Sequence, residues 1–175
     1  MSGLALRVLL AVASLWCLCV PNRSEAQTPG RSVHALVGSG LSIGSAGGGN
    51  TAMLMSPVTI DAGASFWNSE RPALIAGIAG RVELTGRTSL GIVPRLGFHR
   101  DFGIVSLRPS VALPVFLSPF SLLGVEGAVT ARYALGDRFW AIARVAVDAF
   151  FWGSDLPDDS TLIMVNGALG AELQL

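Results

Sequence analysis

The sequence contains no lysine, and its only two cysteines, Cys17 and Cys19, lie within the first 19 residues. The rest of the chain therefore has no disulfide and no cysteine-based metal site. All 12 basic residues are arginines, and they are balanced by 12 acidic residues. Without a basic excess or a basic cluster, no nucleic-acid partner is expected. The only histidines, His34 and His99, are far apart in sequence and no cysteine accompanies them, so zinc is not expected, and we expect no metal and no cofactor.

Long apolar runs are also missing after residue 20, although the mean hydropathy is high at +0.57. A membrane-spanning helix needs about 18 or more consecutive apolar residues. An apolar chain without such a run is either a tightly packed soluble domain or a membrane β-barrel. The barrel is the other backbone arrangement that satisfies all its hydrogen bonds in lipid.

The N-terminal residues have the pattern of a cleaved signal peptide. Arg7 is followed by the apolar stretch Val8–Val20 and by the small-residue segment Ser24–Ala26. This pattern predicts cleavage after Ala26, with residues 1–26 as the signal peptide and residues 27–175 as one barrel domain. An uncleaved anchor helix is the alternative, and the shortness of the apolar stretch disfavours it.

The remaining chain alternates apolar and polar residues with a period of two. In Arg138–Gly153, the odd-numbered positions are all apolar up to Phe151, and the other face carries both Arg144 and Asp148. Similar runs, two of them weaker, occupy Val33–Gly44, Val58–Trp67, Leu74–Leu84, Leu90–His99, Val105–Leu113, Leu123–Arg132 and Val165–Leu175. Eight such runs predict eight strands of the length a tilted membrane strand requires. Helices are disfavoured because glycines recur in nearly every run, at a cost of about 1 kcal/mol each.

The connections fit an antiparallel up-and-down order. Leu84–Ser89, His99–Gly103 and Ala134–Arg138 are predicted to be short turns. The longest connections, Ser45–Met53 and Gly153–Ser160, follow the first and seventh strands and so fall at the same end. With the N-terminus periplasmic, that end is expected to be extracellular.

Aromatic residues after the signal segment all fall at or next to predicted strand ends. Such positions are typical of the two aromatic girdles of a membrane barrel. The predicted girdle residues are Phe66, Trp67, Phe98, Phe102, Tyr133, Phe139 and Trp140 at the periplasmic end, and Phe116, Phe120, Phe150, Phe151 and Trp152 at the other.

The alternation places most charged residues of the strands inside the barrel. The predicted lumen network comprises Asp61, Glu83, Glu126, Asp148 and Glu172 with Arg81, Arg95, Arg108, Arg132 and Arg144. Buried charges are tolerable only when paired, and the planar guanidinium suits carboxylates. An eight-stranded barrel is just wide enough for side chains to fill, so a plugged lumen is expected. A gated or proton-conducting path is the alternative use of this network.

With this pattern the chain resembles the small eight-stranded outer-membrane barrels, the OmpA-like and opacity-protein-like families. The resemblance covers residues 27–175 and rests on pattern, with one departure: the chain ends in Leu175, where such barrels usually end in Phe or Trp. It implies a closed, all-β, up-and-down antiparallel transmembrane barrel in a Gram-negative cell outer membrane. It also implies contact with outer-membrane lipid and lipopolysaccharide, insertion by the outer-membrane assembly machinery, and a monomer.

Few residues suggest chemistry. Ser42 lies in the string Gly40–Gly44, which matches G-x-S-x-G, but no helix follows as a nucleophile elbow requires. The acids Asp155, Asp158 and Asp159 fit no calcium loop and indicate a solvated loop. We therefore expect a structural or surface-interaction role, in adhesion or envelope integrity, with no catalytic residues. The alternatives are a barrel enzyme that modifies outer-membrane lipid and a soluble periplasmic barrel that binds an apolar ligand.

Overall fold

The computed structural model describes residues 30–45, 51–55, 58–68, 73–84, 88–154, 156 and 160–175. The predicted signal peptide and the loop acids Asp155, Asp158 and Asp159 lie outside the described residues. Among the described residues, no helix is long and apolar enough to cross a membrane.

The described residues form ten strand segments, where the alternating sequence predicts eight strands. They are β1 (Gly30–Ser45), β2 (Thr51–Met55), β3 (Val58–Trp67), β4 (Ala73–Leu84), β5 (Ser89–Phe102), β6 (Val105–Ala112), β7 (Val115–Ser118), β8 (Leu122–Ala134), β9 (Phe139–Gly153) and β10 (Thr161–Gln174).

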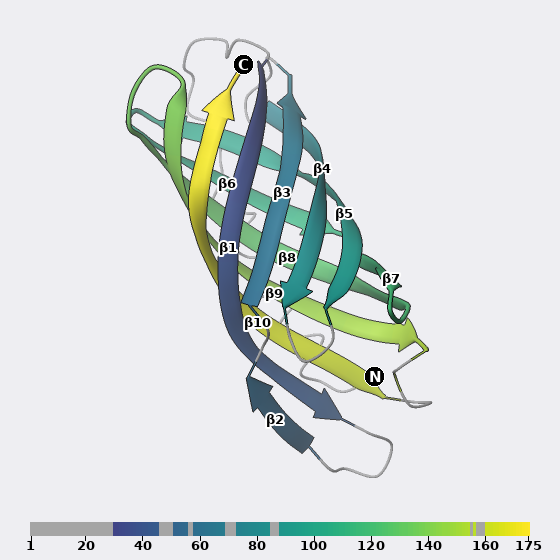
Figure 1. Cartoon of the computed structure of the whole chain (residues 1–175). Helices are drawn as coiled ribbons and strands as arrows, with labels where there is room; N and C mark the ends of the chain where they lie inside the picture. Colours follow the sequence, from purple (N-terminus) through teal and green to yellow (C-terminus); the bar gives the residue numbers. More distant parts are fainter. Residues whose placement is uncertain are drawn as a thin grey trace.

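The segments form one closed antiparallel barrel of eight rows (Figure 1). β2 and β3 both pair with β1 and form one row, while β6 and β7 form another between β5 and β8. The first and last strands close the sheet, because β10 pairs with β1 from Ser32 opposite Gln174 to Ser45 opposite Thr161. The predicted eight-stranded up-and-down barrel is confirmed.

Proline accounts for the interruption between β6 and β7. Pro114 lies between the two segments and is fully buried. Its nitrogen has no hydrogen to donate to a neighbouring strand, but its carbonyl oxygen still accepts a hydrogen bond from Gly124 N–H at 3.1 Å. The row therefore stays in the barrel wall despite the missing donor.

The two ends of the barrel differ in what they carry. One end, called the terminal end, carries both ends of the described chain and the β3–β4, β5–β6 and β8–β9 connections. At this end Leu175 N–H donates a hydrogen bond to the Arg31 carbonyl oxygen at 2.9 Å. The loop end holds the β1–β2, β4–β5, β7–β8 and β9–β10 connections (Figure 1). The long connections after β1 and β9 therefore share one end.

One predicted turn is wrong in position. His99 does not lie in a turn but within β5, and the strand continues to Phe102, which pairs with Val105. The turn is formed by Gly103, with φ of 76°, and Ile104. The polar residues after Phe98 resemble turn residues in composition, but they continue the ladder because their partners on β6 are in register.

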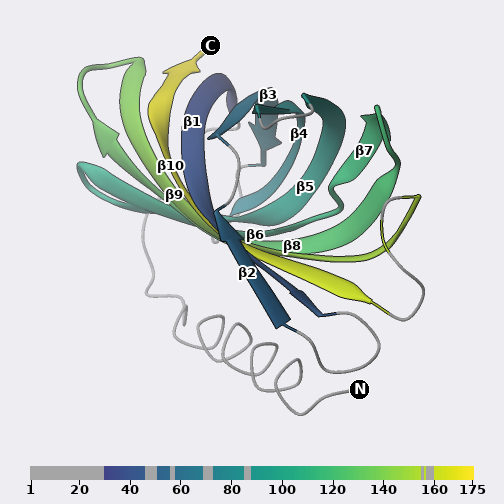
Figure 2. The same ribbon diagram turned by 60° about the horizontal axis from the view of Figure 1, so that its bottom comes forward.

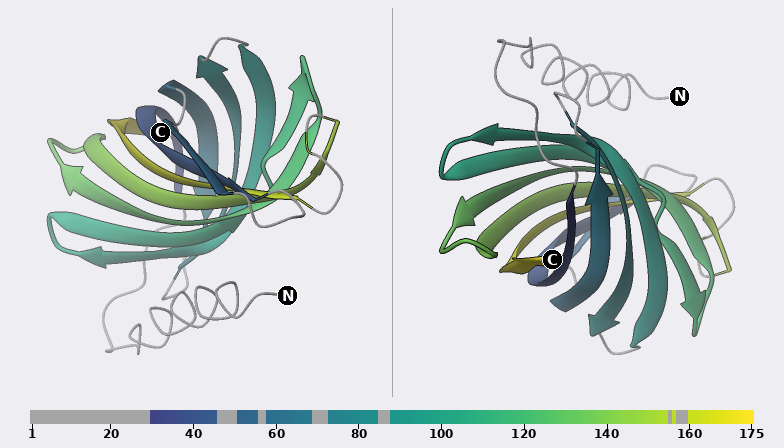
Figure 3. Two further views of the ribbon diagram at one scale, coloured as in Figure 1. Left: turned by 90° about the horizontal axis from the view of Figure 1, so that it is seen from below. Right: turned by 90° about the horizontal axis from the view of Figure 1, so that it is seen from above.

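The strands are strongly tilted. In Figure 1, β1, β3, β4 and β5 run steeply across one side, and β6, β8, β9 and β10 cross behind them. The views in Figures 2 and 3 show the rows curving around a common interior. Tilt of this kind is required to close a sheet of eight strands, and it brings residues from opposite walls to the same depth.

Candidate functional site

The interior of the barrel is a candidate site because nearly all its polar side chains are buried. In β4 and β9, for example, buried residues largely alternate with exposed or half-buried ones, so alternate side chains point inward and outward. All ten predicted lumen charges lie inside: Arg95 has an 11% exposed side chain and the other nine residues are at most 7% exposed. They are not one network. Most of them divide between a central and a terminal-end cluster, and Glu83 stands apart.

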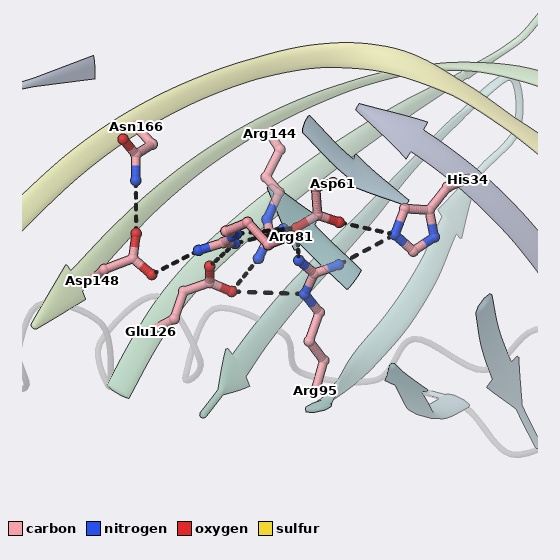
Figure 4. Close-up of polar contacts among 8 residues, drawn as sticks. All are labelled: His34, Asp61, Arg81, Arg95, Glu126, Arg144, Asp148 and Asn166. Atoms are coloured by element: carbon pink, nitrogen blue, oxygen red, sulfur yellow. Dashed lines mark hydrogen bonds and ion pairs between the residues drawn. The ribbon is translucent and has the colours of Figure 1, made fainter. Parts of the chain in front are cut away.

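The central cluster comprises Asp61, Arg81, Arg95, Glu126, Arg144 and Asp148, with His34 and Asn166 at its edges (Figure 4). Arg81 is the hub: its Nη1 donates to Asp148 at 3.2 Å, its Nη2 donates to Asp61 at 3.3 Å, and it also pairs with Glu126. Glu126 in turn accepts a hydrogen bond from Arg144. Three arginines thus face three carboxylates, which is the pairing that buried charges require.

The edges of this cluster add two further partners, Asn166 and His34. Asn166 donates its amide hydrogen to Asp148 at 2.7 Å, and His34 Nε2 lies 3.5 Å from Asp61 and 3.2 Å from Arg95 Nη1. Arg95 also pairs directly with Asp61. The sequence analysis did not predict the part of Asn166 and His34 in this ion-pair cluster.

The terminal-end cluster combines arginines with aromatic rings. Arg108 Nη1 donates to Glu172 at 2.7 Å, and Arg132 Nη2 lies 2.6 Å from the other oxygen of the same carboxylate. Arg132 stacks 4.1 Å from the Trp140 ring centroid, and Arg108 stacks 4.9 Å from that of Trp67. Cation–π contacts of this kind strengthen when they are desolvated.

His99 and Ser106 complete this terminal-end cluster. Arg108 Nε donates to His99 Nδ1 at 2.9 Å, and His99 Nε2 lies 3.0 Å from Asp101. Arg132 Nη1 donates to Ser106 Oγ at 3.1 Å. Composition alone did not indicate His99 as an interior residue, because its neighbours resemble a turn.

The loop end of the interior is closed by apolar side chains. Phe116, Leu122, Phe150 and Met164 form a buried cluster, and the Phe116 and Phe150 ring centroids are 5.8 Å apart. Close to this end, the buried Glu83 accepts a hydrogen bond from Ser89 Oγ at 3.4 Å. The interior side chains therefore lie in three kinds of layer: apolar, ionic, and ionic with aromatics.

The predicted aromatic girdles need correction, because several of the rings point into the barrel. Trp67, Phe116 and Phe150 are 7%, 1% and 1% exposed, and Trp140 stacks on the interior Arg132. Phe120 packs against the loop-end apolar cluster. Adjacent residues on a regular strand face opposite sides, so Phe66 and Trp67, or Phe150 and Phe151, do not both face outward. Phe151 and Trp152 are both exposed because the register of the β8–β9 ladder shifts there. The outward rings are Phe66, Phe98, Phe102, Tyr133 and Phe139 at the terminal end, with Phe151 and Trp152 at the loop end.

Comparisons with known proteins give little beyond this geometry. No protein-family model and no curated protein matches the chain. Among solved structures, it is similar to Ail, the attachment invasion locus protein of Yersinia pestis, which was crystallised with the heparin analogue sucrose octasulfate. The two chains are 13% identical with a TM-score of 0.45, over 83% of this chain and 99% of that one. The likeness is too weak to transfer any property, so function must be argued from the barrel itself.

The candidate nucleophile is not part of a catalytic arrangement with a histidine. Ser42 lies inside at the loop end of β1, eight residues from His34 on the same strand, which corresponds to about 27 Å of extended chain. His99 lies in the terminal-end cluster. A serine and its general base must be within hydrogen-bond distance, and neither histidine meets that condition. In the described part of the chain, no group of three or more potential metal ligands is found.

Proposed function

We propose that the protein is an outer-membrane β-barrel with a plugged lumen and a structural or surface-interaction role in the envelope of a Gram-negative cell. The observation that carries this proposal is the outer surface of the barrel. Large apolar side chains are exposed on all eight rows: Val33, Val37, Val58, Ile60, Leu74, Ile78, Ile92, Leu96, Leu107, Val111, Val125, Val129, Val145, Phe151, Val165 and Leu169. Monomeric soluble proteins rarely expose continuous apolar patches larger than a few hundred Å².

The outward positions in the middle of the strands also lack charge. From Val125 to Ala131, from Ala141 to Ala149 and from Ile163 to Ala171, every outward residue is glycine, alanine or a branched aliphatic residue. Among the described strand residues, the charged groups that face outward are Arg31 and Arg100, both near the terminal end. An apolar band bounded by polar rims matches the hydrocarbon layer of a bilayer.

The outward rings support the same orientation. Phe66 and Phe139 are 55% and 59% exposed near the terminal end, and Trp152 is 63% exposed near the loop end. Rings at these two levels fit the headgroup regions that bound a membrane. We therefore infer that outer-membrane lipid and lipopolysaccharide contact the band, that the assembly machinery inserts the barrel, and that the long connections at the loop end face outward from the cell.

The arrangement disfavours a soluble barrel that binds an apolar ligand. Such a protein needs an apolar interior and a polar exterior, and here the interior contains the ion pairs. A lipid-modifying enzyme is disfavoured by the separation of Ser42 from both histidines. The pairing of β10 with β1 closes the barrel wall, which favours a monomer; among the described strands, β2 pairs with β1 alone and keeps one unpaired edge at the loop end.

Migration of the outer-membrane fraction on a gel, with and without boiling, tests the proposal. A closed barrel resists detergent at low temperature and runs at a different apparent mass until it is heated. We expect the unboiled protein to shift in the outer-membrane fraction. Recovery of the protein in the soluble periplasm, without a shift, would overturn the proposal. A structural role further predicts that deletion weakens the envelope against detergent or weakens surface attachment, and that Ser42→Ala restores the phenotype fully.

A further inference from the structure

The least continuous pairing of the described barrel wall lies between β5 and the row formed by β6 and β7. The β5–β6 ladder covers Arg95–Gly97 and Arg100–Phe102 but is interrupted between these two stretches, and the pairing of β5 with β7 has a register shift. By contrast, the ladders of β9 with β10, of β10 with β1 and of β4 with β5 run without interruption. The contact line between β5 and β6 is called the seam below.

Two prolines remove hydrogen-bond donors from this seam. Leu113 N–H donates to the Pro94 carbonyl oxygen at 3.1 Å, but Pro94 has no N–H with which to return the bond. Hydrogen-bonded pairs recur at every second residue of an antiparallel ladder. Two such steps along the register lead from Leu113 to Pro109, which likewise has no hydrogen to donate to β5. The middle of the seam therefore has fewer backbone hydrogen bonds than a regular ladder, and in a bilayer no water replaces them.

A side-chain hydrogen bond crosses the seam next to Pro109. The register places His99 of β5 opposite Arg108 of β6, and both residues are buried, with exposed fractions of 3% and 5%. Arg108 Nε donates to His99 Nδ1 at 2.9 Å. This bond, called the His99–Arg108 clip, joins the two strands at the level where the backbone ladder is interrupted.

The hydrogen bonds of His99 require its neutral form. Nδ1 must be unprotonated to accept from Arg108, so the ring hydrogen is on Nε2, which lies 3.0 Å from Asp101 and donates to it. A second proton would have to bind Nδ1. The clip therefore exists only while His99 is neutral.

Protonation of His99 would also add a positive charge beside two arginines. Glu172 of β10 pairs with both of these arginines and is the acid that they share. The groups that act on the imidazole from the strands packed around it are Asp101 on β5, Arg108 on β6, Arg132 on β8 and the neutral Trp67 ring on β3. A protonated His99 would thus repel Arg108 instead of accepting its hydrogen bond.

A small cavity behind the seam leaves room for such a movement. Its volume is about 50 Å³, and its lining includes Arg95 and Leu96 of β5, Arg108 and Ser110 of β6, and Arg144 of β9. Protein interiors are close-packed, so a side chain next to a cavity can shift at a lower cost than one that is enclosed on all sides.

We propose that the His99–Arg108 clip is a pH-sensitive device that holds the seam closed while His99 is neutral, and that protonation of His99 lets β5 and β6 separate laterally. The closed seam is favoured at neutral and higher pH, and opening increases as the pH falls through the range in which histidine titrates. The device is a property of the closed sheet and does not depend on where the barrel is located in the cell.

Hydrogen–deuterium exchange of the folded barrel in detergent, read by mass spectrometry of its peptides, measures opening of the seam. We expect the backbone amides of the β5–β6 peptides to exchange roughly tenfold faster than those of the β9–β10 peptides. The ratio of these two rates cancels the intrinsic effect of pH on exchange and any general loss of stability. Equal rates in the two segments would overturn the proposal.

His99→Gln tests the clip itself. Its amide accepts from Arg108 and donates to Asp101 but does not titrate in this range. Lowering the pH from about 8 to about 5 should raise the exchange ratio several-fold in the wild type and leave it unchanged in His99→Gln. His34→Gln, the same change at the other histidine, should keep the wild-type response. No rise in the wild type, or an equal rise in His99→Gln, would contradict the clip.

A disulfide across the seam tests the lateral opening without changing His99. Leu96 and Val111 are opposite each other on the outer face, and the only natural cysteines lie in the predicted signal peptide. The double variant Leu96→Cys with Val111→Cys, once oxidised, should lose the rise of the exchange ratio at low pH and regain it on reduction. A rise that persists in the oxidised form would show that the seam is not where the barrel opens.

Discussion

The two faces of β9 show how differently one strand can be used. Arg144 is 5% exposed and pairs with Glu126 inside the barrel, while the next residue, Val145, is 61% exposed on the outer surface. The inner residue depends on particular partners across the lumen. The contribution of the outer residue to stability depends only on its side chain being apolar. Inner positions should therefore respond to loss of a specific partner, and outer positions to a change of polarity.

The neighbouring aromatic pairs repeat this contrast. Trp67 and Phe150 are buried inside the barrel, whereas Phe66 and Phe151, one residue away, are 55% and 52% exposed outside. Each pair thus contributes one ring to the interior and one to the outer surface. A position near a strand end does not by itself make an aromatic residue part of a membrane girdle. The side chain must also point to the outer face of the barrel.

The largest effect is expected from removing a shared carboxylate of the central cluster. Glu126→Gln should lower the free energy of unfolding by about 3–5 kcal/mol, because it leaves Arg81 and Arg144 buried without full compensation. Urea titration of the folded barrel in detergent measures this change. Asp137→Asn, the same chemical change in the exposed β8–β9 turn, should alter stability by less than ~0.5 kcal/mol. Similar values for the two variants would mean that the cluster contributes no specific stability.

A charge introduced on the outer face should lower the free energy of unfolding somewhat less than loss of the Glu126 carboxylate. The size of the loss should depend on how deep the residue lies in the membrane. Val145→Arg, near the middle of β9, is expected to destabilise the barrel in lipid vesicles by about 2–4 kcal/mol. Tyr133→Arg, near the terminal end of β8, should cost only about 0–1 kcal/mol because the side chain reaches the interface. Refolding into vesicles at several urea concentrations measures both, and equal costs would argue against a bilayer around the outer face.

Truncation of one ring of an adjacent pair sharpens the contrast further. Phe150→Leu should cost about 1–1.5 kcal/mol, since Phe150 packs on Phe116 in the closed loop end. Phe151→Leu, on the outer face, should change the unfolding free energy by less than ~0.5 kcal/mol. The same denaturation assay measures both variants. A larger loss of stability for Phe151→Leu than for Phe150→Leu would mean that Phe151, and not Phe150, packs in the interior.

The smallest effect is expected from a single neutral partner of an interior charge. Ser106→Ala removes the hydroxyl that accepts a hydrogen bond from Arg132, and should cost about 1 kcal/mol. Thr88→Ala, at an exposed position, is the control and should be neutral within ~0.5 kcal/mol. A neutral result for Ser106→Ala would show that stacking on Trp140 and pairing with Glu172 alone hold Arg132 in place.

Much of the architecture could be predicted from the alternation of residue types. The period of two predicted the strands, their antiparallel order and which face each charge occupies, since alternate side chains point to opposite sides of a sheet. The sequence-based prediction was wrong where residue composition indicated a turn, as at His99. Its polar neighbours are typical of a turn, but they remain in the β5–β6 ladder. Pro114 lies at the interruption between β6 and β7, but a missing donor does not by itself break a strand, because Pro94 and Pro109 keep their ladder partners within β5 and β6.

Sequence by itself thus determined that Arg81 and Asp148 face inward, but only the tertiary structure decided that they meet. They are 67 residues apart and lie on different walls of the barrel. Strand tilt and the stagger of pairing set which inward residues share a depth, and both are properties of the closed sheet rather than of any one strand. The same closure collects three arginines around one small cavity. The period of a strand assigns each residue a face, and only closure of the barrel assigns it partners.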